Sequence, residues 1–231
     1  VFTTGTGRIY KSLGNEKLDS RVGELTEQVQ AGGKTRSFSI SYGIEEPDRA
    51  VELLLEPSPA PLEMLILGGG HIAMPLANMA NILGYTVTVV DDRPAFANSS
   101  RFPAAQVICK DFVQALREEP ISPGIFVVIV TRGHRHDKLC LQEVITRSPA
   151  YIGMIGSRRR VKALMSELRE DGTPQETLMM VHSPIGLDIA AETPEEIAVG
   201  ILAEIINVHR GGRAKSLSLH HPTQKVGEYD A

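Results

Sequence analysis

Two short segments carry side chains whose types and spacing suit the binding of a charged ligand, and the first is a glycine loop. Residues 68–73 read GGGHIA and fit the pattern G-x-G-x-x-A through Gly68, Gly70 and Ala73. Glycines at this spacing permit a tight turn and let backbone N–H groups approach a phosphate, which the positive end of a following helix also attracts. His71 stands at the start of that helix, as a ligand contact or as a capping or solvated residue. The pattern predicts a phosphate-binding loop, with a ligand-free tight turn as the alternative.

Acidic side chains follow this loop by about twenty residues, the spacing typical of a dinucleotide-binding unit. Asp91 and Asp92 end the apolar segment YTVTVV. A carboxylate at the end of the second strand accepts hydrogen bonds from a ribose, or from another vicinal hydroxyl or amine. The glycine loop and the acids together therefore predict a nucleotide-like ligand.

The second segment, residues 131–137, reads TRGHRHD and directly follows the apolar run IFVVIV. It places Thr131, Arg132, Gly133, His134 and Asp137 at the end of a buried strand. Three interpretations stay open: a hydrogen-bonding cofactor site, a solvated turn, and a metal site. No second cluster with fixed spacing supports a metal, so no metal ligand is predicted.

A basic cluster follows a later strand, YIGMIG. Ser157 is a good N-cap, yet Arg158, Arg159 and Arg160 fill the first helical turn, where positive charge opposes the helix dipole. The arrangement makes sense if an anion lies there, and a solvated basic turn is the alternative.

A polar loop, HSPIGLDIAAE, precedes the last helix. His182, Asp188 and Glu192 in this loop could point into the same cleft as the basic cluster. The segment that follows, Thr193 to Glu196, reads TPEE and is explained by helix capping alone.

The elements that must position these groups alternate between strands and helices. Apolar strands rich in Val and Ile are expected at MLILGGG, YTVTVVDD, AQVIC, IFVVIVT and YIGMIG, with helices at 71–84, 137–147, 157–170 and 194–209. Strands separated by helices predict an α/β fold, a Rossmann-like parallel sheet with helices on both faces. In such sheets ligands bind at the carboxyl ends of the strands, where all the segments above are expected to lie.

Four parts of the chain are expected. Residues 1–56 read as a small α+β domain, with strands in TRSFSISYG and RAVELLLE and a helix from Leu18 to Gln30, and this domain is expected to be incomplete at its N-terminus. The proline-rich residues 57–62 are a linker. Residues 63–210 form the Rossmann-like domain, and residues 211–231 form a C-terminal tail.

Composition excludes several classes of function. The net charge of −4 argues against nucleic-acid binding, which needs clustered positive charge. No apolar stretch has the length of a membrane span, and no signal-peptide pattern is present, so a cytoplasmic protein is expected. The two cysteines belong to no CxxC pair, which fits a reducing compartment. No Ser-His-Asp order, HExxH or P-loop is present, so no catalytic residue is predicted.

These pieces together resemble the xanthine dehydrogenase accessory-factor family, XdhC/CoxI. The resemblance rests on five segments in order: LILGGGHIAMPLA, VTVVDDRPAFANSSRFPAAQVI, VTRGHRHD, YIGMIGSRRR and HSPIGLDIAAETPEEIAVGILAEII. It covers residues 62–210, and GRIYKSLGNEKLDSRV is more weakly similar to the family's small N-terminal domain. The chain departs from the family in SLGNEKLDS and near SYGIEEP, where cysteine motifs are expected and none is found.

The resemblance implies a non-catalytic chaperone that binds the molybdenum cofactor (molybdopterin) and assists its sulfuration and insertion into a molybdenum hydroxylase. Implied partners are the hydroxylase apoenzyme, a cysteine desulfurase and a second copy of the chain in a homodimer. An NAD(P)-dependent oxidoreductase and a nucleotide-sensing module are the alternatives. The candidate cofactor-binding residues are Gly68, Gly70, His71, Ala73, Asp91, Asp92, Arg93, Thr131, Arg132, Gly133, His134, Asp137, Gly156, Ser157, Arg158, Arg159, Asp188 and Glu192.

Overall fold

A computed structural model describes residues 11–32, 34–41, 50–57, 62–118, 121–122 and 124–215. The chain divides into two compact units, Val1–Ala60 and Pro61–Ala231. Most of the predicted linker and the last sixteen residues of the predicted tail lie outside the described residues, as does the side chain of His134. Within the described ranges, no helix is both long and apolar enough to cross a membrane.

The described residues of the first unit form one helix and one pair of strands. Helix α1 (Glu16–Gly32) buries Leu18, Val22, Leu25 and Val29, which recur at helical spacing along one face. Strands β1 (Arg36–Ser41) and β2 (Ala50–Leu55) pair antiparallel. The predicted small α+β arrangement is therefore found in this part of the chain.

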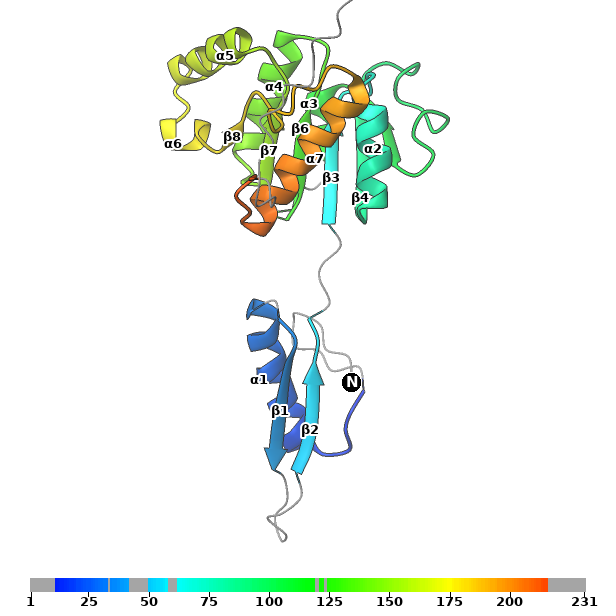
Figure 1. The fold of residues 1–231 in the computed structure, drawn as a ribbon, viewed down its shortest axis with the longest axis vertical. Helices are drawn as coiled ribbons and strands as arrows, with labels where there is room; N and C mark the ends of the chain where they lie inside the picture. Colours follow the sequence, from blue (N-terminus) through cyan, green and yellow to red (C-terminus); the bar gives the residue numbers. More distant parts are fainter. Residues whose placement is uncertain are drawn as a thin grey trace, which may run out of the picture. The chain divides into compact units, whose positions relative to one another are not determined.

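The second unit is built on a six-stranded parallel sheet with the order β5-β4-β3-β6-β7-β8 (Figure 1). Its strands are β3 (Leu62–Leu67), β4 (Tyr85–Asp91), β5 (Gln106–Cys109), β6 (Phe126–Ile129), β7 (Tyr151–Met154) and β8 (Val181–His182). Its helices are α2 (Ala73–Ile82), α3 (Phe112–Glu118), α4 (His134–Ile145), α5 (Arg158–Glu170), α6 (Gln175–Leu178) and α7 (Pro194–Arg210). The predicted α/β fold class, a Rossmann-like parallel sheet, is confirmed.

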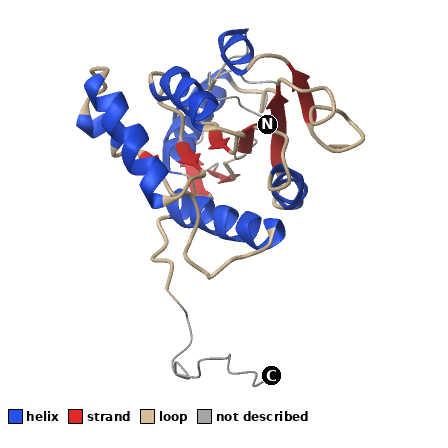
Figure 2. Cartoon of the chain, turned by 90° about the horizontal axis from the view of Figure 1, so that it is seen from above, coloured by secondary structure: helices blue, strands red, loops and turns tan. Residues whose placement is uncertain are grey.

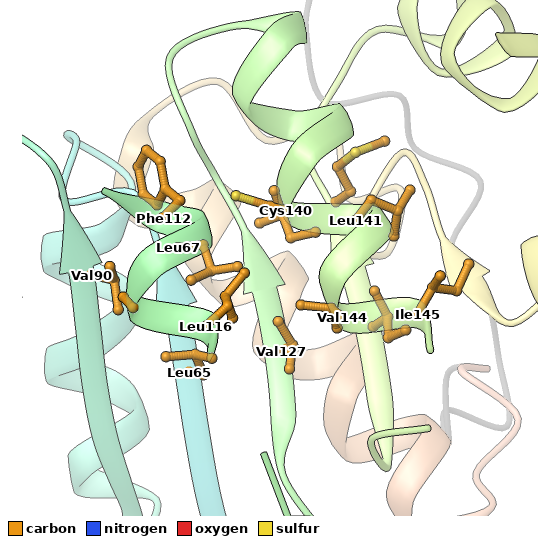
Figure 3. Packing of buried hydrophobic residues seen from close by; sticks show 14 of the residues in the cluster. Leu65, Leu67, Val90, Phe112, Leu116, Val127, Cys140, Leu141, Val144 and Ile145 are labelled. Carbon is orange, nitrogen blue, oxygen red and sulfur yellow. The ribbon is translucent and has the colours of Figure 1, made fainter. Parts of the chain in front are cut away.

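Helices cover both faces of the sheet, as the view from above shows (Figure 2). Successive strand residues point to opposite faces, so Leu65 and Leu67 pack on one side and Met64 and Ile66 on the other. Figure 3 shows the first side, where strand residues meet Leu116 of α3 and the α4 side chains Leu141 and Val144. The opposite core contains α2 and α7. Two filled cores fix the sheet and hence the positions of the loops at its carboxyl edge.

Three short elements differ from the expectations. Helix α3 was not predicted, although Asp111 caps it through Val113 N and Gln114 N. Helix α6 and strand β8 are four and two residues long, too short to produce a period in the sequence. Helix α4 begins at His134 rather than at Asp137, because Gly133 is its N-cap.

Candidate functional site

The strand order brings the predicted ligand-binding segments to one edge of the sheet. Strands β3 and β6 are neighbours, and the chain leaves β3 toward β4 but leaves β6 toward β7, in opposite directions along the sheet. These connections open a crevice at the carboxyl ends of β3 and β6. The glycine loop follows β3 and the segment TRGHRHD follows β6. The acids at the end of β4 and the basic start of α5 after β7 lie at the same edge.

The three loop glycines are required for different reasons. Gly68 has φ +112°, and a Cβ there would lie 2.5 Å from the Val130 carbonyl oxygen. A Cβ on Gly69 would lie 2.7 Å from the Phe96 carbonyl oxygen. A Cβ on Gly70 would meet nothing within 4 Å. Packing therefore explains Gly68 and Gly69, whereas Gly70 faces open space, as a ligand-contacting position would.

Asp91 fastens the glycine loop to the end of β4. Its side chain is 1% exposed and accepts from the Gly69 backbone N–H at 2.8 Å and from Arg93 Nε at 2.8 Å. The Arg93 backbone N–H and Nη2 donate to the same carboxylate. Burial by itself would raise the pKa of Asp91, but these hydrogen bonds outweigh it and hold that pKa below its usual value. Asp91 was expected to face a ligand, and in the structure it bonds to the protein's own donors.

Asp92 and Arg132 form a bridge between the ends of β4 and β6. Arg132 Nη2 lies 3.2 Å from Asp92 Oδ2, and Arg93 Nε lies 3.8 Å from Asp92 Oδ1. Asp92 Oδ1 is buried without a hydrogen bond. The second acid of the predicted ribose site is thus also paired with guanidinium groups, and its Oδ1 keeps acceptor capacity.

An arginine that the sequence reasoning missed supports the same loop. Arg101 Nη2 donates to the Gly69 carbonyl at 3.0 Å, and both Arg101 and Arg93 lie over the ring of Phe96. Arg101 lies in an irregular loop, where no spacing pattern marks it. The contact shows that the glycine loop is held on both its amide and its carbonyl sides.

The segment after β6 is tied to the start of α5 through a buried acid. Asp137 is 3% exposed, accepts from Thr131 Oγ1 at 2.5 Å and pairs with Arg160 Nη2 at 3.3 Å. Thr131 and Asp137, two predicted site residues, therefore join the third arginine of the basic cluster. Asp137 thus positions Thr131 and Arg160 by its contacts with their side chains.

A pocket of about 410 Å³ occupies the crevice, and we call it the crevice pocket. The residues that line it include Gly70, His71, Val130, Thr131, Ser157 and Arg160. Gly156 also lines it. Open backbone at Gly70 and the Arg160 side chain in the same lining suit an anionic group such as a phosphate.

A second pocket of about 380 Å³ adjoins the start of α5, and we call it the loop pocket. It is lined by Arg158 and by the loop 184–191, including Asp188, together with Ile197 and Gly200 of α7. Ser157 lines the crevice pocket, and the next residue, Arg158, lines the loop pocket. The predicted residues Asp188 and Arg158 are brought together, whereas Glu192 is exposed at the start of α7 and lines neither pocket.

Helix α5 keeps its unusual basic start in the structure. Ser157 is the N-cap and accepts from the Arg160 backbone N–H at 3.3 Å. Arg158 and Arg159 are exposed and form no ion pair with any described residue. Two guanidiniums without an ion-pair partner among the described residues thus stand at the N-terminus of α5, and Arg158 lines the loop pocket.

Three predicted residues have structural roles. Ala73, the first residue of α2, is fully buried in the core, and Gly133 is the N-cap of α4. Arg93 is the partner of Asp91.

Among the described residues, no three His, Cys, Asp or Glu side chains are grouped to hold a metal ion. Burial raises the pKa of the Cys140 thiol, and Cys109 is exposed at the end of β5.

Comparisons with known proteins agree with this architecture. Residues 64–205 match the family described as the XdhC Rossmann domain. The chain is 34% identical to the uncharacterized protein YqeB of Escherichia coli (strain K12) over 210 residues, which are 90% of this chain and 38% of that protein. It is 36% identical to a probable xanthine dehydrogenase subunit of Bacillus subtilis (strain 168) over 157 residues, 68% of this chain and 44% of that protein.

A solved structure shares the fold. The protein described as a xanthine dehydrogenase from Bacillus halodurans superposes with a TM-score of 0.61 at 24% sequence identity, over 87% of this chain and 67% of that one. The chain spans less than half the length of the two curated relatives.

Proposed function

Since the chain belongs to the XdhC Rossmann domain family, we propose that it binds the molybdenum cofactor and assists its sulfuration and its insertion into a xanthine dehydrogenase-type apoenzyme. The chain acts as a chaperone and performs no bond-breaking step on the cofactor. A cysteine desulfurase supplies the sulfur, the hydroxylase apoenzyme receives the cofactor, and the chain works as a homodimer in the cytoplasm.

Two observations carry this proposal: an arginine pair at the start of α5 that has no ion-pair partner among the described residues, and a crevice pocket lined by the open Gly70 and by Arg160. Arg158 and Arg159 have no carboxylate partner among the described residues, and Gly70 leaves room for a ligand. Molybdopterin carries a phosphate, sometimes extended by a nucleotide. The backbone at Gly70 and Arg160 would hold that phosphate in the crevice pocket, and Arg158 and Arg159 would balance its charge. When bound, the cofactor supplies the molybdenum that the client enzyme needs.

The residues present fit an anionic cofactor better than they fit a protein-held metal. Neither of the chain's two cysteines lines the crevice pocket or the loop pocket. We therefore propose that the chain binds the organic part of the cofactor, while the cysteine desulfurase delivers the sulfur.

A dinucleotide enzyme or sensor is the second candidate, because the crevice pocket lies at the usual dinucleotide position. The state of the acids weighs against it. Asp91 is buried in contact with Arg93, and Asp92 is paired with Arg132, so a ribose would have to compete with these guanidinium groups for both carboxylates. Quenching of nicotinamide fluorescence on addition of the protein would support this candidate.

The test is to purify the protein anaerobically from cells that make molybdenum cofactor. Molybdenum is measured by mass spectrometry and oxidised pterin by fluorescence, each per chain. We expect near-stoichiometric pterin in the wild type and little in the variant Arg158→Glu/Arg159→Glu. A folded wild type that carries no pterin, but titrates with a nicotinamide nucleotide, would overturn the proposal.

A further inference from the structure

The loop pocket has a chemical character of its own. Apolar side chains form much of its wall, with Ile185, Ile189 and Ile197 among them, and it has two charged side chains, Arg158 and Asp188. Ile189 is 48% exposed, an unusual cost for an apolar side chain unless something covers it. The exposed lining of the pocket is about equally polar and apolar, which suits a flat organic ring with a hydrogen-bonding edge.

Backbone contacts hold the loop that builds this pocket. Ile185 N donates to the Met154 carbonyl at the end of β7 at 3.0 Å, and Leu187 N donates to the Gly200 carbonyl of α7 at 3.1 Å. A Cβ on Gly200 would lie 3.2 Å from the Leu187 carbonyl oxygen, so the loop lies directly on the helix. The loop is therefore fixed to two elements of the core, and the pocket is a formed feature of the fold.

The carboxylate of Asp188 is held by this loop with most of its acceptor capacity free. Its Oδ1 accepts only from the Ala190 backbone N–H, at 3.5 Å, and Ala190 itself adopts φ +55°. Asp188 forms no ion pair with any described residue. A residue other than glycine at positive φ is uncommon, and here it positions the turn that follows Asp188.

We propose that the loop pocket binds a 2-amino-4-oxopyrimidine ring, the edge that pterins and guanine share. Asp188 accepts from the ring N–H and the adjacent amino group, and Arg158 donates to the neighbouring ring carbonyl. The ring lies between the apolar walls. The inference rests on the proposed function in one respect, since it places the phosphate of the same ligand in the crevice pocket, which Ser157 lines.

This pairing also excludes other rings. Adenine presents a lone pair where guanine presents the ring N–H, and xanthine presents a carbonyl in place of the amino group. Adenine would place a lone pair opposite an Asp188 oxygen. Xanthine would keep the ring N–H but place its carbonyl oxygen opposite the other Asp188 oxygen. Each ring therefore loses at least one hydrogen bond and makes two acceptors face each other. The loop pocket thus discriminates by hydrogen-bond pattern rather than by size.

The test measures dissociation constants of GMP, AMP and XMP by calorimetry on the full chain, with 6-hydroxymethylpterin as a competitor. We expect the wild type to bind GMP about tenfold more tightly than AMP or XMP, the size of one charge-assisted hydrogen bond. In Asp188→Asn the amide donates to the xanthine carbonyl, so the order of GMP and XMP reverses. Glu195→Gln, an exposed acid on the first turn of α7, is the matched control and keeps the wild-type order.

Tighter binding of XMP by Asp188→Asn than by the wild type is the decisive result, because misfolding cannot produce a gain of binding. Equal binding of the three nucleotides by the wild type, or loss of GMP binding in Asp188→Asn without a gain for XMP, would overturn the inference. Displacement of GMP by 6-hydroxymethylpterin at lower concentration identifies a pterin as the ligand, and the converse identifies a guanine nucleotide.

Failure of this inference is distinct from failure of the proposed function. If pterin copurifies with the chain but Asp188→Asn leaves the nucleotide preference unchanged, the chaperone function stands and the loop pocket is not the site of the pterin ring. If Asp188→Asn reverses the nucleotide preference but no pterin copurifies with the chain, the assignment of the loop pocket stands and the chaperone function is contradicted.

Discussion

At the residue scale, neighbouring positions at the carboxyl edge of the sheet carry different duties. Gly68 and Gly69 are adjacent to other backbone atoms, and Gly70 is open. Asp91 is wholly engaged by Gly69 and Arg93, whereas Asp188 keeps free acceptor capacity. Substitutions at these positions should therefore separate the stability of the fold from the binding of a ligand.

Replacing Gly70 with valine is expected to abolish binding of a phosphate-bearing ligand and to change the free energy of unfolding by less than about 1 kcal/mol. The reason is that the new side chain enters the crevice pocket and meets no protein atom near its Cβ. Urea denaturation and pterin content measure the two effects. Gly69→Ala is the contrasting variant, and it should lose stability because its Cβ would lie 2.7 Å from the Phe96 carbonyl.

Asp91→Asn is expected to lower the free energy of unfolding by about 2 kcal/mol near neutral pH, because the amide loses the ion pair with Arg93. The pKa of Asp91 is lowered from 3.8 in the folded state. Its carboxylate therefore stabilises the fold above the unfolded pKa, and this stabilisation is lost as pH falls through the folded pKa.

The difference between wild type and Asp91→Asn should accordingly shrink as urea denaturation is repeated at pH values below 3.8. Asp188→Asn is the control, since that exposed acid accepts one long hydrogen bond and should show little difference at any pH. A difference for Asp91→Asn that stays constant down to the lowest pH would contradict the role given to its charge.

At the element scale, two helices of similar length begin in opposite ways. Helix α7 starts with a capping box between Thr193 and Glu196, with acids in its first turn. Helix α5 has no acid in its first turn and carries arginines there. The first start is explained by helix stability, and the second costs stability unless a ligand supplies negative charge.

Arg158→Glu/Arg159→Glu is expected to raise the stability of the ligand-free chain by about 0.5 kcal/mol per substitution, because the new acids favour the positive end of α5. The same variant should bind inorganic phosphate and pterin phosphates at least about tenfold more weakly. Thermal unfolding and calorimetry measure the two effects. Lys162→Glu/Arg169→Glu makes the same change of charge further along α5, and weakened binding in that control would point to net charge instead.

The sequence predicts the longer elements and the edge of the sheet that carries the site, because strands and helices of ordinary length leave a clear period. Helix α3 had a usable signal in the Asp111 cap and in Phe112, Ala115 and Leu116, which share one face. Strand β8 had none at two residues. At the site, residue type and position indicated Gly70, Thr131 and Ser157. They could not reveal that Asp91 is engaged by its neighbours, since that depends on where the Arg93 side chain lies.

At the scale of the whole molecule, the two units differ in what they contain. Residues Pro61–Ala231 hold both large cores of the parallel sheet, the crevice pocket and the loop pocket. The described part of residues Val1–Ala60 has one buried helix face and one antiparallel pair of strands. A two-stranded sheet and one helix form a small core, so most of the stability belongs to the larger unit.

Residues 61–231 expressed alone are therefore expected to unfold cooperatively, with a Tm within about 3 °C of the main transition of the full chain. They should also keep the full chain's affinity for phosphate and pterin, because both pockets are complete within this unit. Differential scanning calorimetry and ligand titration measure these properties. Loss of binding by a folded fragment would show that the first unit contributes to the site.

The separate constraints on the three loop glycines also have an evolutionary meaning. A descendant that lost its ligand would still need Gly68 and Gly69 to close the turn after β3, because backbone atoms of its own chain fill the space beside them. Position 70 would then be released to drift. A change at that single position, in a sequence that keeps the other two glycines, would mark a lineage that has kept the fold but lost the binding of its ligand.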